Sequence, residues 1–125
     1  MDVTPLIPVG RQVIDAYGNG GFRIAGTAHA GSVLVLPEQT LAWDIADFAA
    51  LTLESLAPVV AASPAVEILL LGCGRSMAYL DPALRATLRA QGVKVDAMDT
   101  GAACRTFNVL LAEERRVAAA LIAVD

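Results

Sequence analysis

Two short stretches of the sequence bring together residue types that could bind a ligand or take part in a reaction. One is a Gly-Cys-Gly sequence after an apolar run, and the other begins with Asp-Thr-Gly and continues with helical periodicity. We expect both to lie beyond the carboxyl ends of neighbouring strands, where ligands of open α/β sheets bind. The candidate pocket or partner site consists of Gly72, Cys73, Gly74, Asp99, Thr100, Cys104, Arg105 and Asn108.

A small anion is the ligand that would suit this combination. Gly72 and Gly74 let a backbone approach closely, a helix capped by Thr100 offers free N–H groups, and Arg105 supplies positive charge. The structural alternative is that the glycines form tight turns and that Arg105 pairs with Asp99 or caps carbonyl groups. Acid–base catalysis by Asp99 is less favoured, because a lone carboxylate beside an arginine is more often an ion pair. Since no Gly-Lys-Ser/Thr sequence follows, this is not a P-loop, and nucleotide hydrolysis is disfavoured.

Nucleophilic chemistry would depend on the two cysteines. Cys104 falls in the first turn of the expected helix, where the helix dipole lowers a thiol pKa, and it could also pair with Cys73. The alternative is that Cys104 is a small buried core residue, as most free cysteines are. His29 is the single histidine, so neither a Cys–His catalytic pair nor a Cys/His metal site is expected. We expect no metal and no cofactor, and no catalytic residue stands out.

Two further residues favour a protein interface. Met77 and Tyr79 precede Asp81 in an expected loop, where they would edge a pocket or an interface. Methionine and aromatic residues are enriched at such interfaces. We assign Tyr17 and Trp43 to packing in the core or at its rim.

The length and composition of the chain predict one domain that leaves some apolar surface exposed. The chain has 125 residues, of which 56% are hydrophobic, and its mean hydropathy is +0.59. A chain of this length can bury a stable core without disulfides or metal ions. We therefore expect a single domain over residues 1–125, with residues 1–10 loosely held. The surplus of apolar residues favours an exposed patch for a protein partner.

The net charge and the first residues of the chain limit the partners and the cellular location that we expect. The net charge is −4 and no basic run occurs, which excludes binding of nucleic acid by phosphate neutralisation. The first residues lack the features of a signal or transit peptide, and no apolar stretch is long enough to span a membrane. We therefore expect a cytoplasmic protein that does not span a membrane and is a monomer or a weak dimer.

The first third of the chain predicts short antiparallel strands. Alternating residues 13–17 and 22–25 flank an Asn-Gly turn at Asn19, the strongest short signal of a hairpin. Residues 27–30 form a further strand or a turn, and residues 32–36 and 41–45 form strands.

The remaining chain alternates strands and helices. A helix begins at Thr52, is bent or delayed by Pro58 and ends at Ser63. Strands are expected at 66–71, 93–97 and 117–124, the last apolar throughout. Asp81 caps a helix that stops at Gly92, and Thr100 caps the last helix. This order predicts an α/β layer in which a helical crossover makes the last strand parallel.

Four strings of residues carry a resemblance to a known family. They are Tyr17-Gly-Asn-Gly-Gly-Phe-Arg-Ile24, Gly31-Ser-Val-Leu-Val-Leu-Pro37, Leu69-Leu-Leu-Gly-Cys-Gly74 and Met98-Asp-Thr-Gly-Ala-Ala-Cys-Arg-Thr-Phe-Asn-Val-Leu-Leu111. In this order they resemble the Mth-nine-three-eight-like family of small domains of unknown function, from about residue 14 to residue 124. That family includes mitochondrial complex I assembly factor 3 and the adipogenesis-associated domain protein.

The resemblance implies a three-layer β+α/β/α fold with a mixed central sheet. It places the last strand inside that sheet, antiparallel to its neighbours, and we adopt this in place of the parallel arrangement. An N-terminal antiparallel β layer completes the predicted α/β fold. Because the chain lacks a mitochondrial presequence, it resembles the bacterial members, which have no settled activity.

Two functions from different classes follow. The first is a non-catalytic interaction or assembly factor for a membrane complex of the respiratory type, and it rests on the resemblance and on the high apolar content. The second is a small-molecule or anion-binding protein, or a minor enzyme, with its site at the loop from Gly72 to Arg75 and the N-terminus of the Thr100 helix. Without a catalytic cluster, the sequence favours the first.

Overall fold

The computed structural model describes residues 11–62 and 65–125, and a five-stranded sheet with strand order β5-β4-β8-β6-β7 forms its centre. Its strands are β4 (Val33–Val35), β5 (Thr40–Ala42), β6 (Ile68–Gly72), β7 (Lys94–Met98) and β8 (Val117–Leu121). The expectations for residues 1–10 and for the helix end at Ser63 lie outside the described residues.

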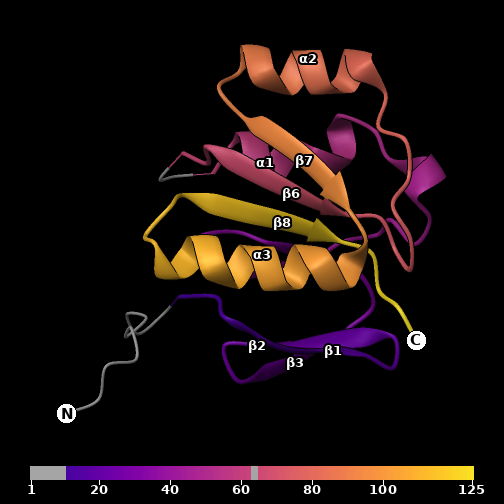
Figure 1. Ribbon diagram of the computed structural model, residues 1–125, viewed down its shortest axis with the longest axis vertical. Coiled ribbons are helices and arrows are strands. Elements are labelled where there is room, and N and C mark those ends of the chain that lie inside the picture. Colours follow the sequence, from indigo (N-terminus) through magenta and orange to yellow (C-terminus); the bar gives the residue numbers. More distant parts are fainter. Residues whose placement is uncertain (1–10, 63–64) are drawn as a thin grey trace.

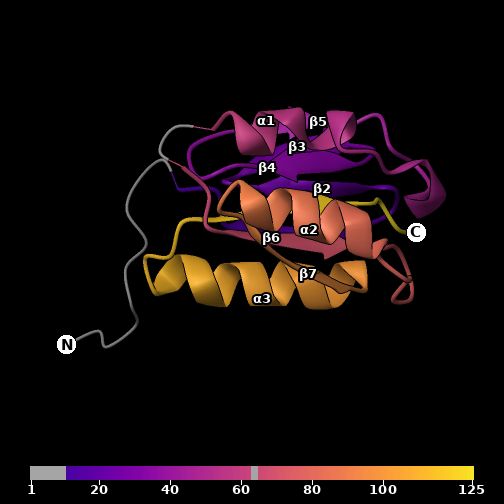
Figure 2. The ribbon, with the colours of Figure 1, turned by 90° about the horizontal axis from the view of Figure 1, so that it is seen from above.

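Figures 1 and 2 show a layer on each side of this sheet. One layer contains α1 (Ala57–Val60) and α2 (Pro82–Ala90). The other contains α3 (Thr100–Ala112) beside a smaller antiparallel sheet made of β1 (Ile14–Gly18), β2 (Gly21–Ile24) and β3 (Thr27–Ala30). The predicted three-layer α/β fold with a mixed central sheet is therefore confirmed.

Strand β8 lies inside the sheet, as predicted, but it is not antiparallel to both neighbours. It runs antiparallel to β4 and parallel to β6. The cause is the connection through α3, which returns the chain along the sheet so that β8 starts at the same end as β6 and β7. The expectation of a fully antiparallel last strand is thus wrong on the β6 side, where the helical crossover gives a parallel pair.

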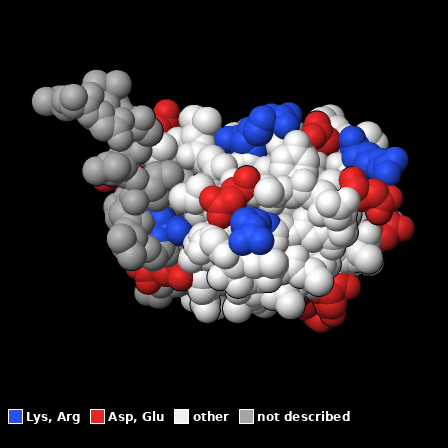
Figure 3. Space-filling model, turned by 90° about the horizontal axis from the view of Figure 1, so that it is seen from below, with Lys and Arg blue, Asp and Glu red and all other residues white. Residues whose placement is uncertain are grey.

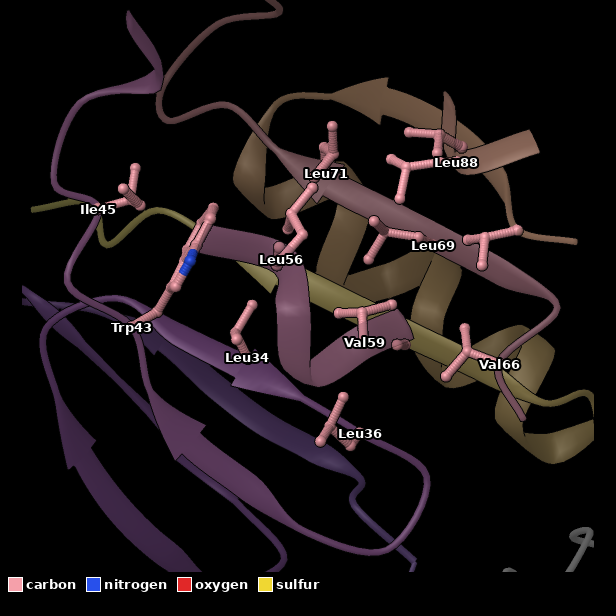
Figure 4. Close-up of a cluster of buried hydrophobic side chains, with 14 of the residues drawn as sticks. Leu34, Leu36, Trp43, Ile45, Leu56, Val59, Val66, Leu69, Leu71 and Leu88 are labelled. Carbon is pink, nitrogen blue, oxygen red and sulfur yellow. The ribbon is translucent and has the colours of Figure 1, made fainter. Parts of the chain in front are cut away.

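The apolar sequence of β8 follows from burial on both faces. Val117, Ala119 and Leu121 pack in the cluster formed with α3 and the smaller sheet. Ala118 and Ala120 belong to the cluster on the other face, which contains Trp43 and Leu88 and is drawn in Figure 4. Because both faces of an interior strand are covered, no position on it favours a polar residue.

The smaller sheet is built from two tight hairpins. Asn19 and Gly20 both have positive φ, 54° and 77°, which is the type I′ turn that the Asn-Gly sequence predicts. Ala25 and Gly26 form a second turn of the same kind, with φ of 49° and 81°. Residues 27–30 therefore form a strand, which settles the choice between strand and turn.

Capping residues and a proline determine where the helices α1 and α2 begin. Asp81 caps α2 by accepting from the N–H of Ala83, as predicted. The expected helix at Thr52 is delayed: Thr52 accepts from the N–H of Ser55 and leads into a short 3-10 turn, and α1 starts only at Ala57. Pro58 stands in the first turn of α1, where its missing N–H costs nothing.

Candidate functional site

Five of the predicted site residues meet where β6 and β7 end. Gly72 closes β6, Cys73 and Gly74 follow it, and Asp99 and Thr100 follow β7. The N–H of Cys73 donates to the carbonyl of Met98 over 2.8 Å, and the N–H of Thr100 donates to the carbonyl of Gly74 over 2.8 Å. The two loops that the sequence placed side by side are therefore in direct contact.

Thr100 does not cap α3, contrary to the prediction. The cap is Asp99, whose carboxylate accepts from the N–H of Ala102 over 2.8 Å. The Thr100 hydroxyl is fully buried, accepts from the N–H of Gly74 over 3.0 Å and donates to the carbonyl of Ile122 over 2.8 Å. Because Asp99 already serves the helix N-terminus, the threonine side chain can turn inward and join two loops.

Gly72 permits this junction through its size. A Cβ at Gly72 would lie 2.9 Å from Cδ2 of Leu121 and 3.1 Å from Cα of Thr100. The glycine thus allows α3 to start directly against the sheet. Its role is to allow close packing of a helix against a strand, as glycines do in open α/β folds. Gly74 instead has a φ of +102° with free space around it, which suits a turn.

The two cysteines differ in burial, Cys104 being buried and Cys73 half-buried. Cys104 is 2% exposed, and burial raises its pKa from the usual 9.0 to about 12. The expectation of a lowered pKa is wrong, because the cost of burying a thiolate raises the pKa by more than the nearby Arg105 charge lowers it. Burial also raises the pKa of the half-buried Cys73. Both thiols are free in the structure, and Cys104 has the core position that was the structural alternative.

Arg105 and Asn108 face the smaller sheet and not the loops after β6 and β7. Arg105 is exposed and donates to the hydroxyl of Tyr17 over 3.0 Å, not to Asp99. The Asn108 amide accepts from the N–H of Ile14 over 2.9 Å and donates to its carbonyl over 2.8 Å. These residues join α3 to β1, so the eight predicted residues do not form one pocket.

A separate surface gathers exposed apolar side chains around the loop between β6 and α2. Met77 is 71% exposed and Tyr79 is 81% exposed. Tyr79 stands between two hollows of about 400 and 370 Å³. We call this region the Tyr79 surface, and its apolar residues are Phe48, Leu51, Leu53, Met77, Tyr79 and Leu84.

A third hollow continues from this loop towards the chain end. It has a volume of about 420 Å³ and is lined in part by Cys73, Gly74 and Arg75. Arg75 forms an exposed ion pair of 3.0 Å with Asp125 at the same hollow. The first loop of the predicted site thus borders the Tyr79 surface, while Arg105 and Asn108 lie against β1.

The sequence indicated only part of the Tyr79 surface. Met77 and Tyr79 were expected at a pocket or an interface, and they line the hollows described above. Phe48 and Leu51 join them although neither follows a regular apolar period in the sequence. The one local signal is Asp47, which caps the short turn that starts at Phe48.

The described residues contain neither a metal-binding cluster nor a membrane-spanning helix. Across residues 11–62 and 65–125, no group of three or more His, Cys, Asp or Glu side chains could hold a metal ion. In that same part of the chain, no helix is long and apolar enough to cross a membrane.

Comparison with known proteins identifies the family. A family model described as a protein of unknown function (DUF498/DUF598) matches residues 14–122. The chain belongs to this family. Its match covers every element described above from β1 to β8, so the resemblance seen in the four sequence strings is confirmed.

Relatives in this family are both animal and bacterial. The chain is 40% identical over 109 residues to NADH dehydrogenase [ubiquinone] 1 alpha subcomplex assembly factor 3 of Xenopus tropicalis, covering 87% of this chain and 60% of that protein. It is 42% identical over 113 residues to an uncharacterized protein of Rhodobacter capsulatus, covering 90% and 86%. The chain therefore spans less than two thirds of the assembly factor that it matches.

Solved structures of family members share the fold. A structure described as an outer membrane protein from Bartonella henselae superposes with a TM-score of 0.85 at 45% identity and covers 94% of this chain and 98% of that chain. A Mth938-like domain from Bordetella pertussis has a TM-score of 0.81 at 30% identity, covering 98% and 92%. The second structure supports the Mth-nine-three-eight-like assignment made from the sequence.

Proposed function

We propose that this chain is a non-catalytic interaction domain that assists the assembly of a membrane-bound complex of the respiratory type, and that it works from the cytoplasm. The observation that carries the proposal is the exposure of Met77 and Tyr79, 71% and 81%, beside two hollows that are lined by apolar residues together with Thr52, Asp81, Arg85 and Asp96. The name of the animal relatives, which are assembly factors for NADH dehydrogenase, indicates the kind of partner.

The Tyr79 surface has the chemistry of a protein-binding site. A tyrosine provides a large apolar ring with a polar tip, and such residues dominate binding energy when a partner buries them. The half-buried Phe48 and Leu84 line the hollow beside that ring. A partner side chain that enters the hollow would contact Tyr79 on one side and the apolar wall on the other.

The polar groups at the ends of β6 and β7 support a role without catalysis. The hydroxyl of Thr100 already has both a donor and an acceptor as neighbours. No buried side-chain nitrogen or oxygen of the described residues lacks a hydrogen-bond partner. Such satisfied groups stabilise the fold, whereas a catalytic group must keep a hydrogen-bond donor or acceptor free for a substrate.

The proposal can be tested by affinity capture from detergent-solubilised native membranes and from cytosol. The baits are the wild-type chain, Tyr79→Ala and the matched control Tyr17→Ala, which removes the same atoms from a tyrosine of the smaller sheet. We expect wild type and Tyr17→Ala to recover subunits of a respiratory complex and Tyr79→Ala to lose them. Equal recovery by all three baits, or no such subunits with wild type, would contradict the proposal.

A further inference from the structure

The edges of the two sheets differ in how they are protected. The edge of β1 is occupied by the Asn108 amide, which makes both possible hydrogen bonds to the backbone of Ile14. At the edge of the central sheet, β7 has its Val95 carbonyl bonded by the Arg85 guanidinium. In both places a helix side chain takes the position of a neighbouring strand, which hinders pairing with another chain.

The other two edge strands are β5 and β3. Strand β5 has only three residues, and its Thr40 hydroxyl donates to the side chain of Gln12. Strand β3 has four residues, Thr-Ala-His-Ala, without charge and without proline, and three of them are exposed. Short length, charges and proline are the usual protections of an edge strand, and β3 has only a short length.

The register of β3 shows which backbone groups face outward. The N–H of Gly31 donates to the carbonyl of Gly20 over 2.8 Å, which places these residues at a hydrogen-bonded position of the ladder, while the N–H of Gly20 donates to Val124. Hydrogen-bonded and non-bonded pairs alternate along an antiparallel ladder. Ala28 and Ala30, paired in register with Arg23 and Gly21, are therefore the non-bonded positions. Their N–H and C=O groups point away from β2 and have no partner among the described residues.

This pattern is complementary to itself. If two copies of β3 run antiparallel with a twofold axis at His29, Ala28 of one copy lies opposite Ala30 of the other. Each such pair exchanges two hydrogen bonds, and together the two pairs satisfy all the outward groups of both strands.

We infer that β3 is a dimerisation edge, at which a second copy of this chain pairs antiparallel about His29 and joins the two smaller sheets into one. Figure 3 shows the molecule from the side of the smaller sheet, where a broad uncharged area surrounds a few charged side chains.

The dimer is weak because the strand is short. A strand of four residues, two of them alanine, buries far less than the roughly 1,200 Å² that marks the lower end of stable interfaces. We expect a dissociation constant between about 10 µM and about 1 mM. The contact involves β3 and not the loop before α2, so this inference and the proposed assembly role can fail independently.

Sedimentation equilibrium from about 10 µM to about 1 mM tests the inference, with amide hydrogen exchange as a residue-specific readout. We expect the amides of Ala28 and Ala30 to become more protected as the concentration rises. Ala28→Pro removes an outward N–H but no bond to β2, and by symmetry it deletes two bonds from the dimer. It should weaken dimerisation about tenfold or more.

A second variant guards against a folding defect caused by proline. Ala28→Lys keeps the backbone N–H and places a charge at the edge, and it should also weaken the dimer, whereas the matched control Ala112→Lys on α3 should not. A wild-type chain that stays monomeric at about 1 mM, or amide protection that does not change with concentration, would overturn the inference. Equal dimerisation of Ala28→Lys and Ala112→Lys would overturn it as well.

Discussion

The hydroxyl of Thr100 donates a 2.8 Å hydrogen bond to the carbonyl of Ile122, a residue 22 positions later in the chain. The same hydroxyl accepts from the N–H of Gly74. One buried oxygen therefore connects the start of α3 with the segment after β6 and the segment after β8. These segments border the Tyr79 surface, so the hydrogen bonds of Thr100 hold the loops beside that surface in place.

Replacing Thr100 with valine should destabilise the fold while preserving its shape. Valine has the same size as threonine, but it leaves the Gly74 N–H and the Ile122 carbonyl buried without partners. We expect the free energy of unfolding to fall by about 1–3 kcal/mol in urea titrations. Thr106→Val, on the same helix but without a side-chain hydrogen bond, should change it by less than about 0.5 kcal/mol. Similar losses for both variants would show that the hydroxyl junction contributes little.

Gly72→Ala should be costly and Gly101→Ala should not. At Gly72 the new methyl group would meet Leu121 and the backbone of Thr100, which are both buried, and we expect a loss of about 1–3 kcal/mol. At Gly101 the methyl group would meet the Tyr17 ring, which is 42% exposed and can turn aside. The higher helix propensity of alanine should offset that change to within about 1 kcal/mol. Thermal melts of the two variants measure the contrast, and the reverse order of stabilities would contradict it.

The buried thiol of Cys104 should make the fold sensitive to alkali. Its pKa is raised from 9.0 to about 12 in the folded chain, so the unfolded thiol ionises first as pH rises. Stability from this group is complete below about pH 9 and is lost as pH rises towards 12, because deprotonation favours the unfolded state. Urea titrations from pH 8 to about pH 11 should show a steeper decline for wild type than for Cys104→Ala. Parallel curves would exclude this linkage.

Asn108 and Arg105 differ in what they stabilise, although both join α3 to β1. Asn108→Ala leaves both backbone groups of the buried Ile14 without a partner and should cost about 1–3 kcal/mol. Arg105→Ala removes one exposed hydrogen bond to Tyr17 and should cost no more than about 1 kcal/mol. Urea titrations compare the two variants. A larger loss for Arg105→Ala would show that the exposed contact, not the amide, holds the smaller sheet to α3.

Local signals in the sequence predicted the elements that depend on neighbouring residues. The Asn19-Gly20 hairpin and the start of α2 at Asp81 both form where expected, because a turn or a cap needs only a few adjacent residues. The helix start at Asp99 shows how narrow such signals are. Aspartate and threonine are both good caps, and only the buried acceptor at Ile122 draws Thr100 inward and leaves the cap to Asp99.

The candidate site could be predicted only in part for the same reason. The contact between the loops after β6 and β7 follows from the order of the elements, since parallel neighbouring strands end at one edge. The direction of a side chain on α3 depends on what packs beside the helix. Arg105 and Asn108 turn to β1 because the smaller sheet lies there, and no local pattern in the sequence specifies that neighbour.

The sequence by itself determined the α/β class, the Asn19-Gly20 hairpin turn, the family and the all-apolar character of β8. These depend on periodicity, turn residues and short strings, which act over a few positions. Only the tertiary structure decided the pairing of β8 with both β4 and β6, the high pKa of Cys104 and the open edge of β3. Each of these depends on which distant groups exclude water or offer a hydrogen bond, and the folded chain alone brings those groups together.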